Sequence, residues 1–173
     1  MDSRLPKFLF VVIALYAAIH FSHSYSQLPD VVASHLDGRG VANGWQTKSA
    51  FFTVLVGVSV LAAVVGFGIP LIIAALPPRL INLPNKAYWL APDHLAESME
   101  FLNNHFAWFG CAVFVVIIFA FDFAVQSNLH RDTQPDVSRV WYILGGFLLF
   151  VVVWIARMFA RFGRPPRDNP SLK

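Results

Sequence analysis

Four long apolar runs constrain this chain more than any other feature of its sequence. They cover about residues 8–26, 50–76, 106–126 and 140–160. A helix that rises about 1.5 Å per residue needs about 20 residues to cross the hydrocarbon core of a bilayer, and each run is close to that length. Because a helix satisfies every backbone polar group within one segment, the sequence predicts an all-α fold, an integral membrane four-helix bundle.

Composition supports this prediction and leaves room for one domain. Hydrophobic residues make up 57% of the 173 residues and charged residues 13%, whereas ordinary soluble domains have about 25% charged residues. The runs use so much of the chain that no separate soluble domain of ordinary size fits. We therefore expect a single membrane domain over residues 1–163 and a flexible basic tail over 164–173.

The basic residues beside the runs predict the orientation, because Lys and Arg gather on the cytoplasmic side. Both termini are then cytoplasmic, residues 27–49 form an external loop, and residues 77–105 form a cytoplasmic amphipathic segment. The basic tail is attracted to anionic lipid, so the bilayer is the expected partner and nucleic acid is not. The nine residues on the inner side are Arg4, Lys7, Arg79, Lys86, Arg157, Arg161, Arg164, Arg167 and Lys173, and the four on the outer side are Arg39, Lys48, Arg131 and Arg139.

The first run has two interpretations. A short apolar run after Arg4 and Lys7 is also typical of a signal peptide. It is followed by bulky residues such as Phe21 and Tyr25 rather than by a cleavage site of small residues, which favours an uncleaved span. Whether the span is cleaved stays open.

The second run carries a small-residue face and a proline. Ala62 and Gly66 are four residues apart, so they lie on one side of a helix that can approach another helix closely. That face packs either on another helix of the same chain or on a second chain, which leaves a homo-oligomer or hetero-oligomer through the second span open. We expect a kink just before Pro70.

The external loop holds the densest group of unusual residues. Capping and turn chemistry explains it without a ligand: Pro29 and Asp30 start a short helix, and Gly38 or Gly40 ends it. In the functional interpretation, three side chains instead point together into an external pocket for a peptide, a lipid head group or a metal ion. Those three are Asp30, His35 and Lys48. A metal site needs three or four ligands in fixed geometry, so we predict no metal and no cofactor.

A resemblance to a known family enters on these loop residues. The matching positions are Leu28, Pro29, Asp30, His35, Gly40, Trp45 and Lys48. This combination resembles the bacterial family of unknown function at the N-terminus of SdpI-like immunity proteins, and it covers about the first third of the chain. The sequence departs from the family pattern at Ala33 and Leu36, where family members usually have a proline and an aromatic residue.

The resemblance implies a multi-pass protein of the bacterial cytoplasmic membrane, a short four-span member of this group. It also implies an immunity or sensing role: non-enzymatic recognition of an envelope-active peptide or a lipid through the first external loop. An extracellular peptide is then a partner. The alternative that the sequence leaves open is a small accessory subunit that packs on a larger membrane transporter or enzyme.

Two polar residues lie inside or beside apolar runs, which is costly without a partner. Asp122 stands in the third run and His20 at a similar depth in the first. We expect Asp122 to pair with His20, with Lys48 or with interfacial water; a ligand-binding or proton-handling role is the alternative. No recognised catalytic motif is present, so the sequence favours a non-enzymatic protein without excluding an enzyme.

Overall fold

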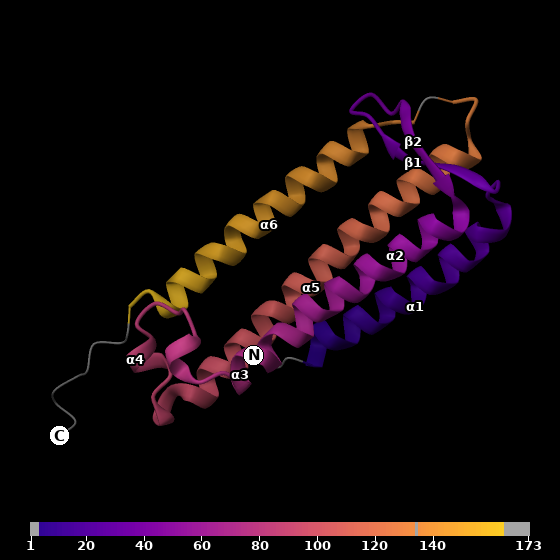
Figure 1. The fold of residues 1–173 in the computed structure, drawn as a ribbon. Coiled ribbons are helices and arrows are strands. Elements are labelled where there is room, and N and C mark those ends of the chain that lie inside the picture. The colour runs from indigo at the N-terminus through magenta and orange to yellow at the C-terminus, as the bar shows by residue number, and fades with distance from the viewer. Residues whose placement is uncertain (1–3, 134, 165–173) are drawn as a thin grey trace, which may run out of the picture.

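The computed structural model describes residues 4–133 and 135–164 and is mostly helical. The long elements are α1 (Arg4–Gln27), α2 (Lys48–Ala63), α5 (Pro92–Leu129) and α6 (Ser138–Phe162). α2 continues through a π-helical turn (Val64–Gly68) into α3 (Ile69–Ala75), and short helices follow at Pro78–Leu80 and at α4 (Lys86–Trp89). Two strands, β1 (Val31–Leu36) and β2 (Ala42–Thr47), join α1 to α2 (Figure 1).

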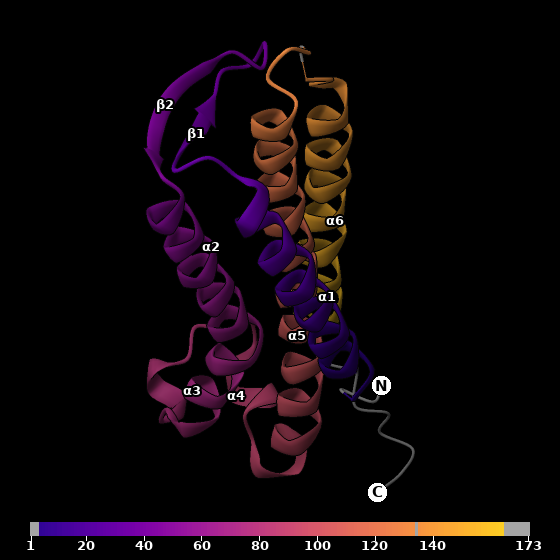
Figure 2. The ribbon, with the colours of Figure 1, turned by 90° about the vertical axis from the view of Figure 1, so that its right-hand side faces the viewer.

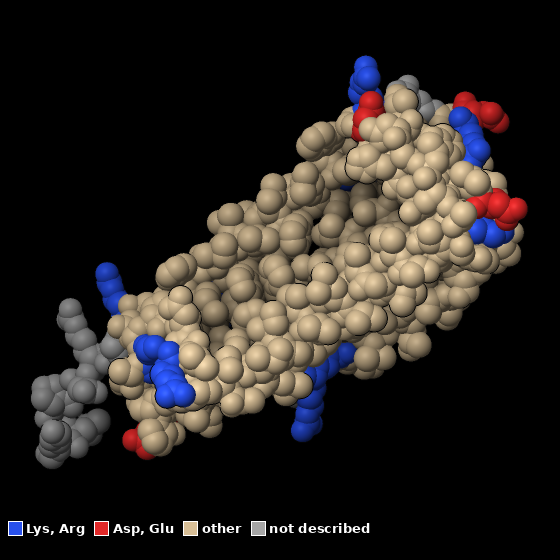
Figure 3. Space-filling model, in the orientation of Figure 1, with Lys and Arg blue, Asp and Glu red and all other residues tan. Residues whose placement is uncertain are grey.

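The four apolar runs all form helices, so the prediction of a mostly helical fold with four long apolar helices is confirmed. Helices over 4–27, 48–75, 92–129 and 138–162 are each long and apolar enough to cross a membrane. α6 ends at the end of the molecule opposite the strands, and α1 begins toward that end (Figures 1 and 2). Charged side chains on the face in Figure 3 lie at the two ends and beside the start of α1. This distribution fits an integral membrane protein.

The all-α prediction is wrong in one element, the first loop. The structure has an antiparallel β-hairpin there, with Val31 paired to Thr47 and Leu36 to Ala42, instead of the short helix expected from Pro29 to Gly38 or Gly40. Asp37 and Gly38 lie at the turn, and Gly40 has a φ of 81°, which glycine adopts without steric cost. Cross-strand hydrogen bonds therefore replace helical ones from Val31 onward.

The second span contains a π-helical turn directly before Pro70, where the sequence predicted a kink. The amide of Ile69 bonds to the carbonyl of Val64, a π-helical spacing. Pro70 has no amide hydrogen, and its ring clashes with the carbonyl four residues earlier in a regular helix. The π turn at Val64–Gly68 relieves that clash directly before Pro70.

The small-residue face of the second span packs inside the chain, against α5. Gly66 and Gly110 approach so closely that a Cβ built on Gly66 would lie 2.9 Å from the Cα of Gly110. Ala62 is 1% exposed. Of the two interpretations of this face, packing between helices of one chain describes the structure, and an oligomer through the second span stays a prediction that would need other residues of that span.

The main core joins α1, α2, α5 and the hairpin, and α6 stands apart from it. Val32 of β1 and Val125 of α5 have no exposed surface, so the hairpin is part of the core. No residue in the most apolar 18-residue stretch of α6 is buried. Between its ends α6 lies beside α5, and Figure 3 shows a long hollow between α6 and the rest of the molecule.

A second, smaller core closes the end opposite the hairpin. Trp89 of α4 and Phe162 of α6 are buried there against Leu102 of α5. The amphipathic segment expected before the third span is the first part of α5, continuous with the span, and its apolar face covers this core. The lone cysteine is buried, with the Cys111 thiol donating to the carbonyl of Pro6 at 3.1 Å. The tail from residue 165 onward lies outside the described residues.

Candidate functional site

The hairpin turn is held by the carboxylate of Asp37. Its Oδ1 accepts hydrogen bonds from the amides of Arg39 and Val41, at 2.8 and 2.9 Å. These two backbone donors favour the charged carboxylate, the Val41 amide most, and they lower the pKa of Asp37 below its usual value. These hydrogen bonds hold the turn in one conformation, in which Leu36, Asp37 and Gly38 face α5 and α6.

The three loop residues expected to form a binding pocket do not converge. Asp30 Oδ1 lies 3.2 Å from Lys48 Nζ, but the Asp30 side chain is 95% exposed. The Lys48 amide also donates to the carbonyl of Asp30 at 2.9 Å. His35 lies further along β1, where it is exposed and faces Gly44 across the strands. The Asp30 and Lys48 pair thus joins the two ends of the hairpin, and His35 lies away from it.

Three other loop residues named in the sequence analysis are Pro29, Gly40 and Trp45, and the contacts of Gly40 and Trp45 are packing contacts. Pro29 is exposed just before β1. Gly40 packs against the ring of Pro135, so near that a Cβ would lie 2.7 Å from its Cγ. Trp45 is 55% exposed, with the guanidinium of Arg131 5.3 Å from its ring centre. These contacts hold the hairpin against the connection between α5 and α6.

Asn128 fixes the hairpin to α5, and sequence reasoning missed it. Its Oδ1 accepts from the Ala33 amide and its Nδ2 donates to the Ala33 carbonyl, both at 2.8 Å. The side chain satisfies both backbone groups of a buried strand residue, and Asn128 itself is 5% exposed. A carboxamide near the end of an apolar helix was the available signal. Asn128 makes the hairpin a rigid cap on the helices.

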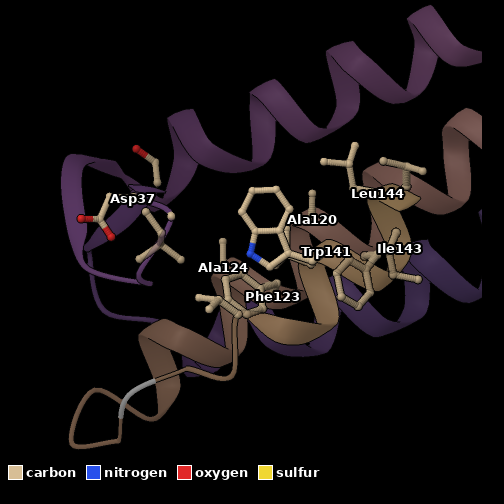
Figure 4. A pocket seen from close by; sticks show the side chains of 14 residues that line it. Asp37, Ala120, Phe123, Ala124, Trp141, Ile143 and Leu144 are labelled. Atoms are coloured by element: carbon tan, nitrogen blue, oxygen red, sulfur yellow. The ribbon is translucent and has the colours of Figure 1, made fainter. Parts of the chain in front are cut away.

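A cavity of about 280 Å³ lies under this cap, between the hairpin, α5 and α6. Figure 4 shows it from close by, with Trp141 and Phe123 inside and Asp37 at its rim. We call it the hairpin cavity. Its lining is mostly apolar. The hairpin supplies Ser34, Leu36, Asp37 and Gly38, and α5 supplies Val116, Phe119, Ala120, Phe123 and Ala124. The remaining lining residues are Val137, just before α6, and Val140, Trp141, Ile143 and Leu144 of α6.

The two polar residues that the sequence places in apolar runs, His20 and Asp122, lie together. His20 Nε2 is 2.7 Å from Asp122 Oδ1, so Asp122 faces His20 and not Lys48, whose carboxylate neighbour is Asp30. The ring of Tyr16 stacks on the imidazole with 5.6 Å between centroids and 6° between planes. Gln126 Nε2 donates to the same Asp122 oxygen at 3.4 Å. This pair joins α1 to α5 within the apolar part of both helices.

Two further cavities meet at Asp122 and Phe119. The first, the polar vestibule of about 270 Å³, lies toward the hairpin end and includes Gln126, Ser127, His130, Thr133, Asp136 and Arg139. The second, the His20 groove of about 280 Å³, lies deeper and is lined by His20, Ile13, Tyr16, Val115, Ile118 and Ile143. Asp122 therefore stands between a polar and an apolar compartment.

Arg161 is the centre of a side-chain cluster at the opposite end of the molecule, and sequence reasoning counted it only among the basic residues on the inner side. The guanidinium of Arg161 lies 4.1 Å from the ring centre of Trp89, and its Nη2 lies 2.7 Å from Glu97 Oε1. The Trp89 indole and the Asn85 amide both donate to the carbonyl of Phe162, at 3.1 and 2.9 Å. These bonds cap the last turn of α6.

Within residues 4–133 and 135–164, no three His, Cys, Asp or Glu side chains gather closely enough to hold a metal ion. The arrangement offers hydrogen-bonding groups and apolar cavities. No protein-family model, no curated protein and no solved structure matches this chain.

Proposed function

We propose that this chain is a non-enzymatic membrane protein that binds lipid in the hairpin cavity, as a short relative of the SdpI-like group in a bacterial cytoplasmic membrane. The observation that carries the proposal is the cavity itself, about 280 Å³ of mostly apolar lining that opens between two apolar helices. Ligand sites are typically concave, apolar and bordered by a few polar groups. Asp37 and Ser34 supply such groups at the rim.

The proposal keeps the first loop as the recognising element but moves the role to other residues. Leu36, Asp37 and Gly38 of the hairpin line the cavity, whereas Asp30 and Lys48 pair with each other. An acyl chain matches the lining, and α6 leaves the cavity open beside α5. A peptide is the other ligand class that the resemblance implies.

A cavity-filling variant tests lipid binding. Ala120 lines the hairpin cavity, so Ala120→Phe should lower the amount of lipid that co-purifies with the protein in mild detergent, measured by mass spectrometry of the extracted lipids. Ala156→Phe is the matched control, because Ala156 is an exposed alanine of α6 that lies outside this cavity. Equal lipid in the wild type and both variants would refute the proposal.

The peptide alternative has its own test. Cells that carry the His35→Ala, Lys48→Ala double variant are compared with a deletion strain during exposure to envelope-active peptides. Lost protection with normal accumulation of the variant would assign peptide recognition to the outer face of the hairpin. Protection equal to that of the wild type would leave lipid as the ligand class.

We further propose that both termini are cytoplasmic and that the hairpin is external. The excess of Lys and Arg near the ends opposite the hairpin supports this orientation. Cys111 is buried and is the only cysteine, so a cysteine at exposed Asn43 in β2 should react with an impermeant maleimide in intact cells. A cysteine at exposed Lys86 should react only after permeabilisation; the opposite pattern would reverse the orientation.

A second candidate is the accessory subunit, and the isolated position of α6 favours it. Leu149 and Val152 are 66% and 63% exposed there, so a helix of a larger membrane protein has an apolar face to pack on. Replacing both by alanine should release such a partner from the purified complex. A chain that purifies from native membranes with no partner subunit would count against this candidate.

A further inference from the structure

The pair of His20 and Asp122 is not sealed inside the bundle. The two side chains are 28% and 37% exposed, although both belong to helices that are long and apolar enough to span a membrane. Asp122 lies seven residues before Leu129, the last residue of α5, which is about 10 Å along the helix. A pair that served only to join α1 and α5 would gain from complete burial, because exposure to lipid is costly for a carboxylate.

The exposed part of the pair faces cavities of opposite character. The polar vestibule and the His20 groove both include Asp122 and Phe119. Their volumes of about 270 and 280 Å³ together fall within the usual range for ligand sites, about 300–1,000 Å³. The polar cavity lies toward the hairpin end and the apolar cavity lies deeper. An amphiphilic ligand would fit this order with its head group toward the hairpin.

Asp122 also keeps an acceptor free within the described part of the chain. Its bonds from His20 and Gln126 both reach Oδ1, so Oδ2 has no protein donor there. We propose that Asp122 Oδ2 accepts a hydrogen bond from a neutral, hydroxyl-bearing lipid whose chain fills the His20 groove. This site is separate from the hairpin cavity, although Phe119 and Ile143 line both.

The chemistry of the pair selects a hydroxyl over charged head groups. A carboxylate or phosphate would be repelled by Asp122 in a region of low dielectric constant. An ammonium group would be attracted to the carboxylate, but the cost of stripping the hydration shell from a second charge beside an apolar groove exceeds that attraction. A hydroxyl donates one hydrogen bond, costs little to desolvate and leaves the contact between His20 and Asp122 in place.

The test uses three probes that share one chain and differ in the head group: oleyl alcohol, oleic acid and oleylamine. Binding to the purified full chain in detergent is measured by native mass spectrometry, and we expect oleyl alcohol to bind most tightly. In Asp122→Asn the amide oxygen can still accept from His20, and an amide donor then replaces Oδ2. Since a hydrogen bond to a charged group is lost, oleyl alcohol should bind roughly tenfold more weakly or worse.

A second pair of variants keeps the test decisive if Asp122→Asn does not fold. Val115 lines the groove and is 43% exposed, so Val115→Trp should abolish binding of oleyl alcohol. Val153→Trp, at a position of α6 that is 49% exposed and lies outside the groove, should bind it as the wild type does. Tighter or equal binding of the acid or the amine, or equal binding by both tryptophan variants, would overturn the proposal. Ala120→Phe changes only the hairpin cavity, so it should leave oleyl alcohol binding unchanged.

Discussion

The second span and α5 approach each other closely at Gly66 and Gly110, and adding one methyl group there should push the two helices apart. A Cβ on Gly110 would lie 2.7 Å from the Cα of Gly66 and 3.3 Å from the carbonyl oxygen of Ala62. Both neighbours are backbone atoms, which cannot rotate away as a flexible side chain can. The helices themselves must move, and with them the packing of α5 against the second span.

The size of the effect follows from two opposing contributions. Overpacking a well-packed contact costs about 1–3 kcal/mol. Replacing glycine by alanine in a helix gains about 0.5–1 kcal/mol from reduced backbone entropy in the unfolded chain. Gly110→Ala should therefore lower the free energy of unfolding by up to about 2 kcal/mol once the gain in helix propensity is included.

The matched control removes the propensity contribution. Gly57 belongs to α2 and has no atom within 4 Å of a built Cβ, so Gly57→Ala should be neutral or stabilising. Unfolding by SDS in mixed micelles, followed by circular dichroism, measures both variants. We expect the two to differ by about 1–3 kcal/mol. Equal free energies of unfolding would refute the close contact as a determinant of the fold.

Three further predictions concern the hairpin and the opposite end. Asn128→Leu leaves both backbone groups of a buried strand residue without partners, so it should cost about 1–3 kcal/mol and speed amide exchange in the hairpin, measured by mass spectrometry. The pKa of Asp37 is lowered in the folded chain. The charged carboxylate therefore stabilises the turn fully above pH 3.8, its ordinary pKa, and this stabilisation is lost as the pH falls through the lower pKa of the folded chain. The NMR resonance of the Val41 amide should follow this titration, and it should not do so in Asp37→Asn. Arg161→Lys removes a planar group stacked on Trp89 and should lower the free energy of unfolding by about 1 kcal/mol, measured by the same SDS titration.

The helices were predictable because apolar length alone determines them. An apolar run of about 20 residues can satisfy its backbone in lipid only as a helix, which is the reason for predicting one at each run, and Pro70 had to disturb the second helix because it lacks an amide hydrogen. The limits of the helices were less predictable. α5 extends from Pro92 through the last part of the predicted amphipathic segment (77–105) into the third apolar run, since nothing between Asp93 and that run interrupts a helix.

The hairpin was missed because Pro29 and Asp30 were interpreted as the start of a helix. Asp37 followed by Gly38, after a run that begins with two valines, is also typical of a hairpin turn. The choice between the two depends on Asn128, which lies 95 residues from Ala33 and satisfies both of its backbone groups. Sequence patterns near residue 30 contain no information about that long-range contact.

The proximity of His20 and Asp122 was predictable because the two residues lie at a similar depth in their apolar runs, and the hairpin explains why the two depths correspond. Each residue lies seven positions before the end of its helix, at Gln27 and Leu129. The hairpin starts four positions after the end of α1 and is fixed by Asn128 to the end of α5, so the two helix ends are held at the same level. Equal distances from a shared cap then place the imidazole opposite the carboxylate. We infer that the hairpin, bonded to α5 by Asn128, helps to keep α1 and α5 in the register that brings His20 and Asp122 together.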